Sequence, residues 1–322
     1  MTSHQYIFCL VLLIVFLNGC SSSWNVNNEK FLPASSPTPN SLNVKFLGVS
    51  NVYLHDGSTS ILIDGFLSRR GISALFHGMN TDKEVVLNTL KKSNIHSLNA
   101  LLVAHSHFDH ALDAKFIADL KQSKIYGSEL SNEVIDSNLF TVVNDGDSYK
   151  FGRFTVTFIE TPHVNKSKFL RFLESAITLV TRGTRFKKID KNFSFYIEHE
   201  LGNVLIVPSA NYKPNKFNKL HANLVFLGIG LLGNQPTEYI DRYWIETVEK
   251  TKANIVVPVH WDSFYKPLDD GLIGVSDLVD DLTRTMSILR RKADENPNVE
   301  LLFMHPIKNT NLTTNSSFLR VE

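Results

Sequence analysis

The sequence contains almost no cysteine. Cys9 and Cys20 are the only two in 322 residues, and neither lies beyond position 20. A domain that begins after Cys20 therefore has no thiol with which to form a disulfide or bind a metal ion. Any metal site in this domain must be built from histidine and carboxylate side chains.

An excess of charge of one sign is also missing. Lys and Arg number 33 and Asp and Glu number 32, which gives a formal net charge of +1. This balance argues against a nucleic-acid enzyme. The sequence has no glycine-rich phosphate loop and no internal repeat of short period. Its length suits one large domain or two small ones.

The N-terminal region also lacks an apolar run long enough to span a membrane comfortably. The apolar run from Ile7 to Leu17 is too short for a comfortable membrane span, but it suits the apolar part of a secretory signal. It ends in Leu17-Asn18-Gly19-Cys20, which resembles the bacterial lipoprotein cleavage box. In that box the signal is removed and the cysteine is acylated, for example with palmitate.

This resemblance implies a signal peptide at residues 1–20 and an exported cell-envelope lipoprotein that is anchored to the membrane through Cys20. In a Gram-negative cell we expect the periplasmic side of the outer membrane. The sequence lacks the Lys or Arg that usually precedes such a run, so a plain secretory signal or an uncleaved anchor is the alternative. Residues 21–41, rich in Ser, Asn and Pro, are expected to form a flexible tether.

A dense cluster of metal-binding residue types follows a predicted strand. The apolar stretch from Leu98 to Ala104 is succeeded by His105-Ser106-His107-Phe108-Asp109-His110. Residues two apart in an extended segment point the same way, so the first two histidines can bind one cation. Asp109 and His110 turn into the next helix, where a carboxylate and an imidazole suit a second divalent metal. A solvated polar loop is the alternative.

Three further candidates end predicted strands, a usual location for sites in layered α/β folds. Asp64 fits a carboxylate that orients a neighbouring ligand, although a simple turn aspartate has the same signature. His163 fits a further ligand of the first cation, and His260 ends another strand; a lone strand-end histidine is more often a surface residue. His199 falls within a predicted hairpin, and we interpret it as structural.

Residues 164–192 are rich in Lys and Arg, with Phe side chains between them. Because this segment follows His163 directly, we interpret it as a basic lid that attracts an anionic or amphiphilic substrate or an anionic lipid surface. The cations expected to face a substrate are Lys166, Lys168, Arg171 and Arg185. A solvated, loosely ordered insertion is the alternative.

The final third alternates predicted strands and helices. Strands are expected at 224–228, 255–260 and 299–303, with helices at 237–252 and 275–291. In the last helix, apolar residues recur at helical spacing from Val275 to Leu289, which indicates a face that packs on the core.

In their order along the chain, these site residues resemble the pattern of the metallo-β-lactamase-fold hydrolases. The resemblance spans residues 42 to about 305 and implies an α/β fold, namely an αββα four-layer sandwich of two mixed β-sheets, at 42–310, followed by a C-terminal tail at 311–322. It assigns the first metal to His105, His107 and His163, and the second to Asp109, His110 and His260. Asp64 would orient these ligands from behind. The expected cofactor is one or two Zn²⁺ ions, with Mn²⁺ or Fe²⁺ as alternatives.

The sequence departs from that family in one respect. The family's bridging aspartate usually ends the strand after the third histidine, whereas here the strand ends in Val207-Pro208-Ser209-Ala210. Without a bridging carboxylate the second metal should be held more weakly. The site would then work with one metal, or with a hydroxide as the only bridge.

The resemblance implies hydrolysis by a metal-activated hydroxide, with Asp109 and His110 as catalytic residues. The basic segment favours a phosphodiester or another anionic ester, small or lipid-like, and the motifs look closest to phosphodiesterases and N-acyl-phosphatidylethanolamine phospholipases. One alternative is a lactone, ester or amide hydrolase, as in β-lactam cleavage. The other is a non-catalytic metal-binding lipoprotein with a decayed site.

Overall fold

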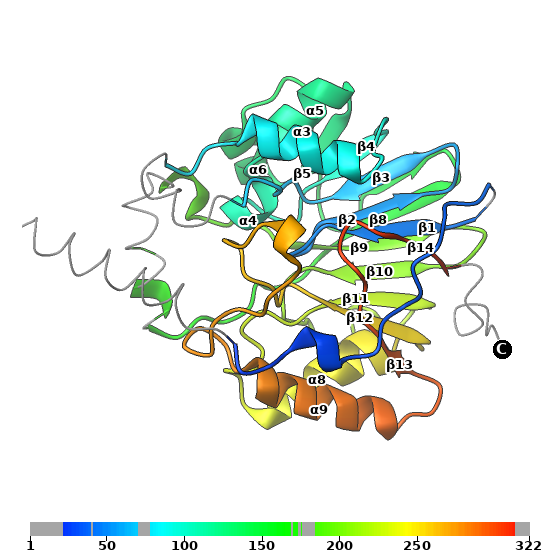
Figure 1. Ribbon diagram of the computed structural model, residues 1–322, viewed down its shortest axis with the longest axis vertical. Helices are drawn as coiled ribbons and strands as arrows, with labels where there is room; N and C mark the ends of the chain where they lie inside the picture. Colours follow the sequence, from blue (N-terminus) through cyan, green and yellow to red (C-terminus); the bar gives the residue numbers. More distant parts are fainter. Residues whose placement is uncertain are drawn as a thin grey trace, which may run out of the picture.

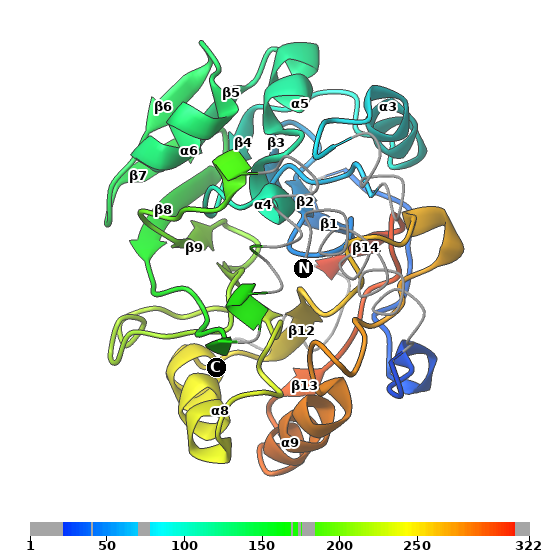
Figure 2. The same cartoon turned by 90° about the vertical axis from the view of Figure 1, so that its left-hand side faces the viewer.

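Two seven-stranded sheets stack face to face, with helices on their outer faces (Figures 1 and 2). The computed structural model describes residues 22–39, 41–69, 78–168, 170–172, 175 and 184–312. Both sheets mix parallel and antiparallel neighbours. The predicted αββα sandwich is therefore confirmed.

The first sheet has the spatial order β14-β1-β2-β3-β4-β5-β6. Its strands are β1 (Asn43–Phe46), β2 (Val52–His55), β3 (Ser60–Ile63), β4 (Ala100–Leu102), β5 (Lys124–Gly127), β6 (Phe140–Val142) and β14 (Asn309–Asn311). The outer face is covered by α3 (Lys83–Lys92), α4 (Phe108–Ala111), α5 (Ala114–Lys121) and α6 (Glu129–Ile135) (Figure 1).

The second sheet has the spatial order β13-β12-β11-β10-β9-β8-β7. Its strands are β7 (Ser148–Phe151), β8 (Phe154–Glu160), β9 (Phe193–Glu198), β10 (Val204–Val207), β11 (Leu224–Gly228), β12 (Ile255–Val259) and β13 (Glu300–Leu301). Its outer helices are α8 (Thr237–Trp244), continued by a wider turn at Ile245–Glu249, and α9 (Leu282–Asp294). The remaining short helices are η1 (Val26–Asn28), η3 (Thr184–Phe186) and η5 (Leu268–Asp270).

The central strands β10, β11 and β12 are buried along their whole length. A sheet covered on both faces gains from apolar side chains at every position, which explains why these strands read as continuous Val, Ile and Leu runs instead of alternating patterns. Such a rigid layer fixes the positions of the loops that follow its strands, among them the loop after β12 that carries His260. The other candidate ligands follow β4 of the first sheet and β8 at the other side of the second sheet.

The predicted helix at 275–291 is wrong in its first half. The helix α9 begins at Leu282, because the Asp281 side chain accepts a hydrogen bond from Arg284 N and caps it. Asp280 is buried and accepts hydrogen bonds from Leu231 N (2.7 Å) and Gly233 N (3.1 Å). Leu278, which the pattern placed on the core face, is 51% exposed.

The predicted flexible tether at 21–41 is also wrong for residues 22–32, which we call the N-terminal strap. The Trp24 ring packs edge-on against Trp261, with 5.0 Å between ring centroids, and its indole N–H donates to Glu29 Oε1. Val26 and Leu32 are buried in the same core. The strap folds onto the domain because these few apolar side chains find a hydrophobic groove there.

Two other predicted segments concern the chain ends. The predicted signal at residues 1–20 lies outside the described residues. At the other end, Asn311 pairs with Asn43 of β1 and Leu312 is buried, so the domain continues past the expected boundary at 310. Residues 313–322 lie outside the described residues. Among the described helices, none combines the length and hydropathy needed to span a bilayer.

We predict that Trp24→Ala lowers the free energy of unfolding by about 3 kcal/mol, because it empties a buried aromatic site. Chemical denaturation of the two proteins measures the difference. Phe172→Ala is the control, since Phe172 is 66% exposed and should cost little. A Trp24→Ala protein as stable as the parent would show that the strap does not contribute to the fold.

Candidate metal centre

The histidine-rich loop begins where β4 ends and runs into the short helix α4. His105 and His110 have no exposed surface, and His107 and Asp109 are 7% and 6% exposed. Four ionisable side chains in such a small buried volume carry a large desolvation cost unless they are paired or bind a metal ion. The partners of these four side chains therefore indicate whether they are built to bind a metal ion.

His105, His107 and His163 form one group of converging ligand atoms. The facing ring nitrogens of His105 (Nε2) and His107 (Nδ1) are 3.2 Å apart, and the His163 ring lies 4.9 and 5.0 Å from theirs, between centroids. His163 Nδ1 lies 3.0 Å from the Val164 carbonyl oxygen, to which it can donate, leaving Nε2 as a lone-pair donor. We call these three residues the first triad.

Asp109, His110 and His260 form a second group, which we call the second triad. Asp109 Oδ2 is 3.3 Å from His110 Nε2 and 3.1 Å from His260 Nε2. In each triad one ligand atom per residue can be chosen so that all lie within 4.8 Å of one another. The rings of His105 and His110 are only 3.9 Å apart between centroids, so the two triads are adjacent.

Asp64 lies directly behind the second triad. Its Oδ2 accepts hydrogen bonds from His110 Nδ1 (2.7 Å) and from Ser50 Oγ (2.6 Å), and its Oδ1 accepts one from Ala104 N (2.9 Å). A carboxylate in this position fixes the histidine tautomer, so that Nε2 faces the neighbouring ligands. The residue itself has a positive φ of 60°, which turns its side chain back toward the loop.

The electrostatics of the two triads differ. Burial lowers the pKa values of His105 and His107 well below the usual value, with a contribution from Lys166 at His107; burial and Lys166 lower that of His163 to about 3. The first triad thus consists of neutral imidazoles. In the second, burial opposes ionisation of Asp109, but His110 holds the Asp109 pKa well below its usual range.

This donor set fits a divalent metal ion. Two neutral imidazole lone pairs that face each other across 3.2 Å need a proton or a cation between them. Three imidazoles beside a group of two imidazoles and one carboxylate are the ligands that borderline-soft divalent ions such as Zn²⁺, Mn²⁺ and Fe²⁺ accept. The chemistry of the residues therefore matches the cofactor that the sequence suggests.

Comparisons with solved structures agree with this architecture. A metallo hydrolase from the archaeon Ignicoccus hospitalis has a TM-score of 0.52 at 13% identity, covering 84% of this chain and 97% of its own. A proposed metal-dependent hydrolase from Parabacteroides distasonis has a TM-score of 0.51 at 12% identity, covering 85% and 98%. The two stacked sheets, with the two triads at one edge, decide the assignment of the fold. The chain has the metallo-β-lactamase fold.

CmlA, a diiron β-hydroxylase from Streptomyces venezuelae, also matches, with a TM-score of 0.50 at 14% identity over 86% of this chain and 55% of CmlA. No family model and no curated protein matches the sequence. At these identities the likeness establishes the metallo-β-lactamase fold and not the reaction or the metal.

Ser209 lies just after β10, at the position where the resemblance leads us to expect a bridging aspartate. Its Oγ accepts a hydrogen bond from Val164 N (2.9 Å), and Asn211 Nδ2 donates to the His163 carbonyl oxygen (2.7 Å). The end of β10 therefore holds the backbone beside His163 in place and supplies no carboxylate between the triads.

The four predicted lid cations are not equivalent. Lys166 is half-buried and close enough to lower the pKa values of His107 and His163, whereas Lys168, Arg171 and Arg185 are exposed. Residues 169, 173–174 and 176–183 of the predicted lid lie outside the described residues. Closure of this segment over the site stays a prediction.

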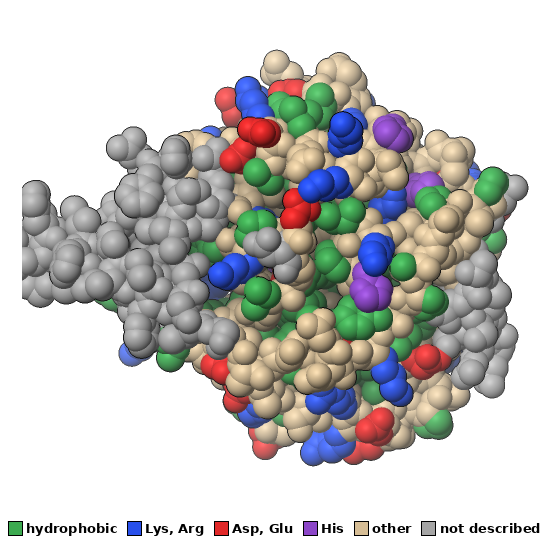
Figure 3. All heavy atoms as spheres, in the orientation of Figure 1, with side chains coloured by type: hydrophobic (Ala, Val, Ile, Leu, Met, Phe, Trp, Pro, Cys, Tyr) green, Lys and Arg blue, Asp and Glu red, His purple; other side chains and the backbone are tan. Residues whose placement is uncertain are grey.

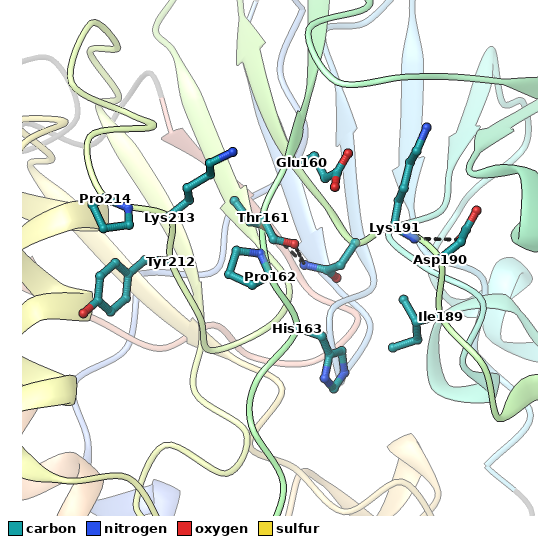
Figure 4. A pocket seen from close by; sticks show the side chains of 11 residues that line it. Glu160, Thr161, Pro162, His163, Ile189, Asp190, Lys191, Tyr212, Lys213 and Pro214 are labelled. Atoms are coloured by element: carbon teal, nitrogen blue, oxygen red, sulfur yellow. Dashed lines mark hydrogen bonds between the residues drawn. The ribbon is translucent and has the colours of Figure 1, made fainter.

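An open pocket of about 620 Å³ adjoins the metal centre. It is lined by the end of β8, by residues 189–192 and by the loop at 212–214. Figure 4 shows His163 at one end and the side chains of Lys191 and Lys213 extending toward the other. The pocket also carries Glu160 and Asp190, so its wall is polar and of mixed charge.

Sequence reasoning missed the residues that hold His260. His260 has a positive φ of 62°, and its N–H donates to the Val49 carbonyl oxygen. Gly230 leaves room for the ring, since a Cβ there would lie 2.6 Å from His260 Nδ1. Asp262 forms a buried ion pair with Arg69 just after the ligand. No local pattern links these positions, because their contacts span the whole chain. His199 contacts Asp56 instead, as expected of a structural residue.

We predict that Asp64→Asn weakens metal binding by about 10–100-fold, because the amide cannot hold His110 as the carboxylate does. Competition with a chromogenic chelator measures the affinity. Asp136→Asn, at an exposed helix end, is the control and should bind as the parent does. Unchanged metal affinity in Asp64→Asn would show that Asp64 does not support metal binding.

Proton release should distinguish the two triads. Burial lowers the pKa of His110, but Asp64 and Asp109 outweigh it and raise that pKa to about 10. At pH 7 the metal-free His110 is therefore protonated and must lose one proton when an ion binds the second triad, whereas the neutral first triad should release almost none. Calorimetric titration in buffers of different ionisation enthalpy tests this. Equal proton release for both binding steps would contradict the assignment.

Proposed function

We propose that the protein is a metal-dependent hydrolase that acts on a phosphodiester or another anionic ester. The observation that carries this proposal is the convergence of two adjacent triads at one edge of the sandwich. A divalent ion bound there would supply a nucleophile at neutral pH and polarise the oxygen of the bond that is cut.

Asp109 is the residue best placed to manage the proton of the attacking water. Its carboxylate is ionised, buried and in contact with both His110 and His260. It can accept a hydrogen bond from the attacking water and so direct a lone pair of the water oxygen toward the substrate. His110, kept in one orientation by Asp64, completes this arrangement.

The cations around the site support an anionic substrate. Lys166 acts electrostatically on the first triad, and Lys191 and Lys213 line the adjoining pocket. On the face shown in Figure 3, basic side chains are interspersed with acidic ones. The net charge of +1 and the mixed charges of the pocket suit a small or lipid-like substrate better than a nucleic acid.

A second candidate is hydrolysis of a neutral ester, lactone or amide. Glu160 and Asp190 line the same pocket and offset its positive charge, which favours this alternative over a strictly anionic substrate. A non-catalytic metal-binding role is the remaining candidate, and the serine at position 209 is the feature that favours it.

We further propose that the protein is exported and attached to the cell envelope through an acylated Cys20. The support is the apolar run from Ile7 to Leu17 and the cleavage-box resemblance that ends in Cys20. Such an enzyme would meet lipid-like esters at the membrane surface.

We predict that His107→Ala and Asp109→Asn each lower hydrolysis by about 10³-fold or more while the fold is retained, because His107→Ala removes a ligand of the first triad and Asp109→Asn removes the carboxylate of the second. Turnover of bis(p-nitrophenyl) phosphate, p-nitrophenyl acetate and a chromogenic β-lactam measures activity, and circular dichroism checks the fold.

His96→Ala and Asp136→Asn are matched controls at exposed positions away from the triads and should turn over substrate as the parent does. Full activity in either triad variant would refute the hydrolase mechanism. Activity on the neutral esters alone would replace the phosphodiester by the second candidate, and metal binding without turnover of any ester would favour the non-catalytic role.

A further inference from the structure

The described chain begins at the edge of the sandwich that carries the metal centre. Ser23 N donates to Asp277 Oδ2 (2.9 Å), Ser22 Oγ donates to Asp277 Oδ1 (3.3 Å), and Ser23 Oγ lies 2.9 Å from Thr283 Oγ1. Figure 1 shows this start, in blue, on the same side of the molecule as α4 and the orange loop after β12. The strap is therefore fixed to the domain from its first described residue.

A chain of direct contacts connects the strap to a candidate metal ligand. Trp24 packs on Trp261, which follows His260, and the Phe264 ring lies 5.2 Å from the His260 ring. The loop between them returns to the strap, where a Cβ on Gly274 would lie 3.1 Å from the Ser22 side chain. Whatever surface the strap touches thus lies close to His260 of the second triad.

The chain before the strap is too short to let the domain turn away from a membrane. Only Ser21 separates Cys20 from Ser22, so an acyl group on Cys20 is at most about 7 Å of chain away from the strap. If the apolar run is retained as an anchor, the reach from Leu17 is about 18 Å. A domain of this size is roughly 50 Å across, so either anchor keeps the strap at the bilayer.

The surface around the strap suits an anionic bilayer. Ile273 and Leu278 are exposed beside the residues that bind Ser22 and Ser23, at 39% and 51%. The segment that leaves His163 adds Phe172, 66% exposed, and the exposed cations Lys168, Arg171 and Arg185. Apolar side chains among cations are typical of surfaces that bind the headgroup region of anionic membranes.

We infer that this edge docks on an anionic bilayer and that the metal centre opens toward the membrane. The docking edge consists of Ser22–Trp24, residues 271–278 and the described residues 168, 171–172 and 185. The inference rests on the proposed membrane attachment and goes beyond the proposed hydrolysis: it places the site where the ester of a lipid headgroup reaches it by lateral diffusion.

Fluorophores at two matched positions test this geometry. The full chain is reconstituted into phosphatidylcholine vesicles that contain phosphatidylglycerol and a lipid with a nitroxide on its headgroup. Ile273→Cys and Leu120→Cys are labelled; both positions are apolar and similarly exposed, at 39% and 43%, and Leu120 lies on α5 away from the docking edge. Signal from the parent chain, which reports any thiol that remains at Cys9 or Cys20, is subtracted. We expect several-fold stronger quenching at position 273.

Charge reversal tests the basic part of the edge. Lys168→Glu with Arg171→Glu should weaken quenching at position 273, whereas the control pair Lys83→Glu with Lys115→Glu on α3 and α5 should leave it unchanged. An equal effect of the two pairs would overturn the electrostatic docking. Equal quenching at 273 and 120, stronger quenching at 120, or a full chain that does not stay with the vesicles would overturn the orientation.

These readouts do not depend on turnover. Quenching at 273 in a protein that hydrolyses no ester would leave the docking edge standing and refute the hydrolase. Turnover with equal quenching at both positions would leave the hydrolase standing and refute the docking edge.

Discussion

The hydrogen bond between Asp64 and His110 is the constraint on which the rest of the centre depends. Asp64 follows β3, and its two carboxylate oxygens also accept hydrogen bonds from Ser50, which follows β1, and from Ala104, which follows β4. One buried carboxylate thus links three loops of the first sheet. Its partner His110 is in turn in contact with Asp109 and His260, so the second sheet is positioned through the same interaction. A carboxylate that is buried and fully engaged in this way keeps the ligands in place before any metal ion binds.

The centre is asymmetric in charge, and this asymmetry bears on the occupancy of the two triads. The first triad consists of three neutral imidazoles, whereas the second contains one carboxylate, that of Asp109. The strand-end position of Ser209 contributes a hydroxyl that fixes the backbone at Val164. The imidazoles of the first triad are already neutral, whereas His110 of the second triad must lose a proton before an ion binds, because its pKa is raised to about 10. The first triad is therefore expected to hold its ion more tightly.

The central residues could be predicted from the sequence because they follow local rules, and the fold could be predicted from the family resemblance that these residues carry. Strand ends meet at one edge of a sheet, so a histidine or aspartate after an apolar run is placed near the others whatever the intervening chain does. His105, His163 and His260 obey that rule, His107, Asp109 and His110 follow within five residues of His105, and the structure brings all six together.

What could not be predicted depends on contacts between distant parts of the chain. The strap has the composition of a linker, and only the groove around Trp261 makes its Trp24 a core residue. The segment 275–291 fits an amphipathic helical pattern, but Asp280 accepts hydrogen bonds from the loop at 231–233, so the helix starts later. Arg69 and Asp262 form a buried pair across almost two hundred positions, which no local spacing reveals.

The most direct test of the central claim is the metal content per chain, measured by elemental mass spectrometry on the purified protein and on its His107→Ala variant. We expect at least one zinc, manganese or iron ion per chain in the parent, a second ion that a mild chelator removes first, and loss of the tightly held ion in His107→Ala. A parent protein with no metal above background, under conditions that load related sites, would contradict the metal centre and the hydrolase built on it.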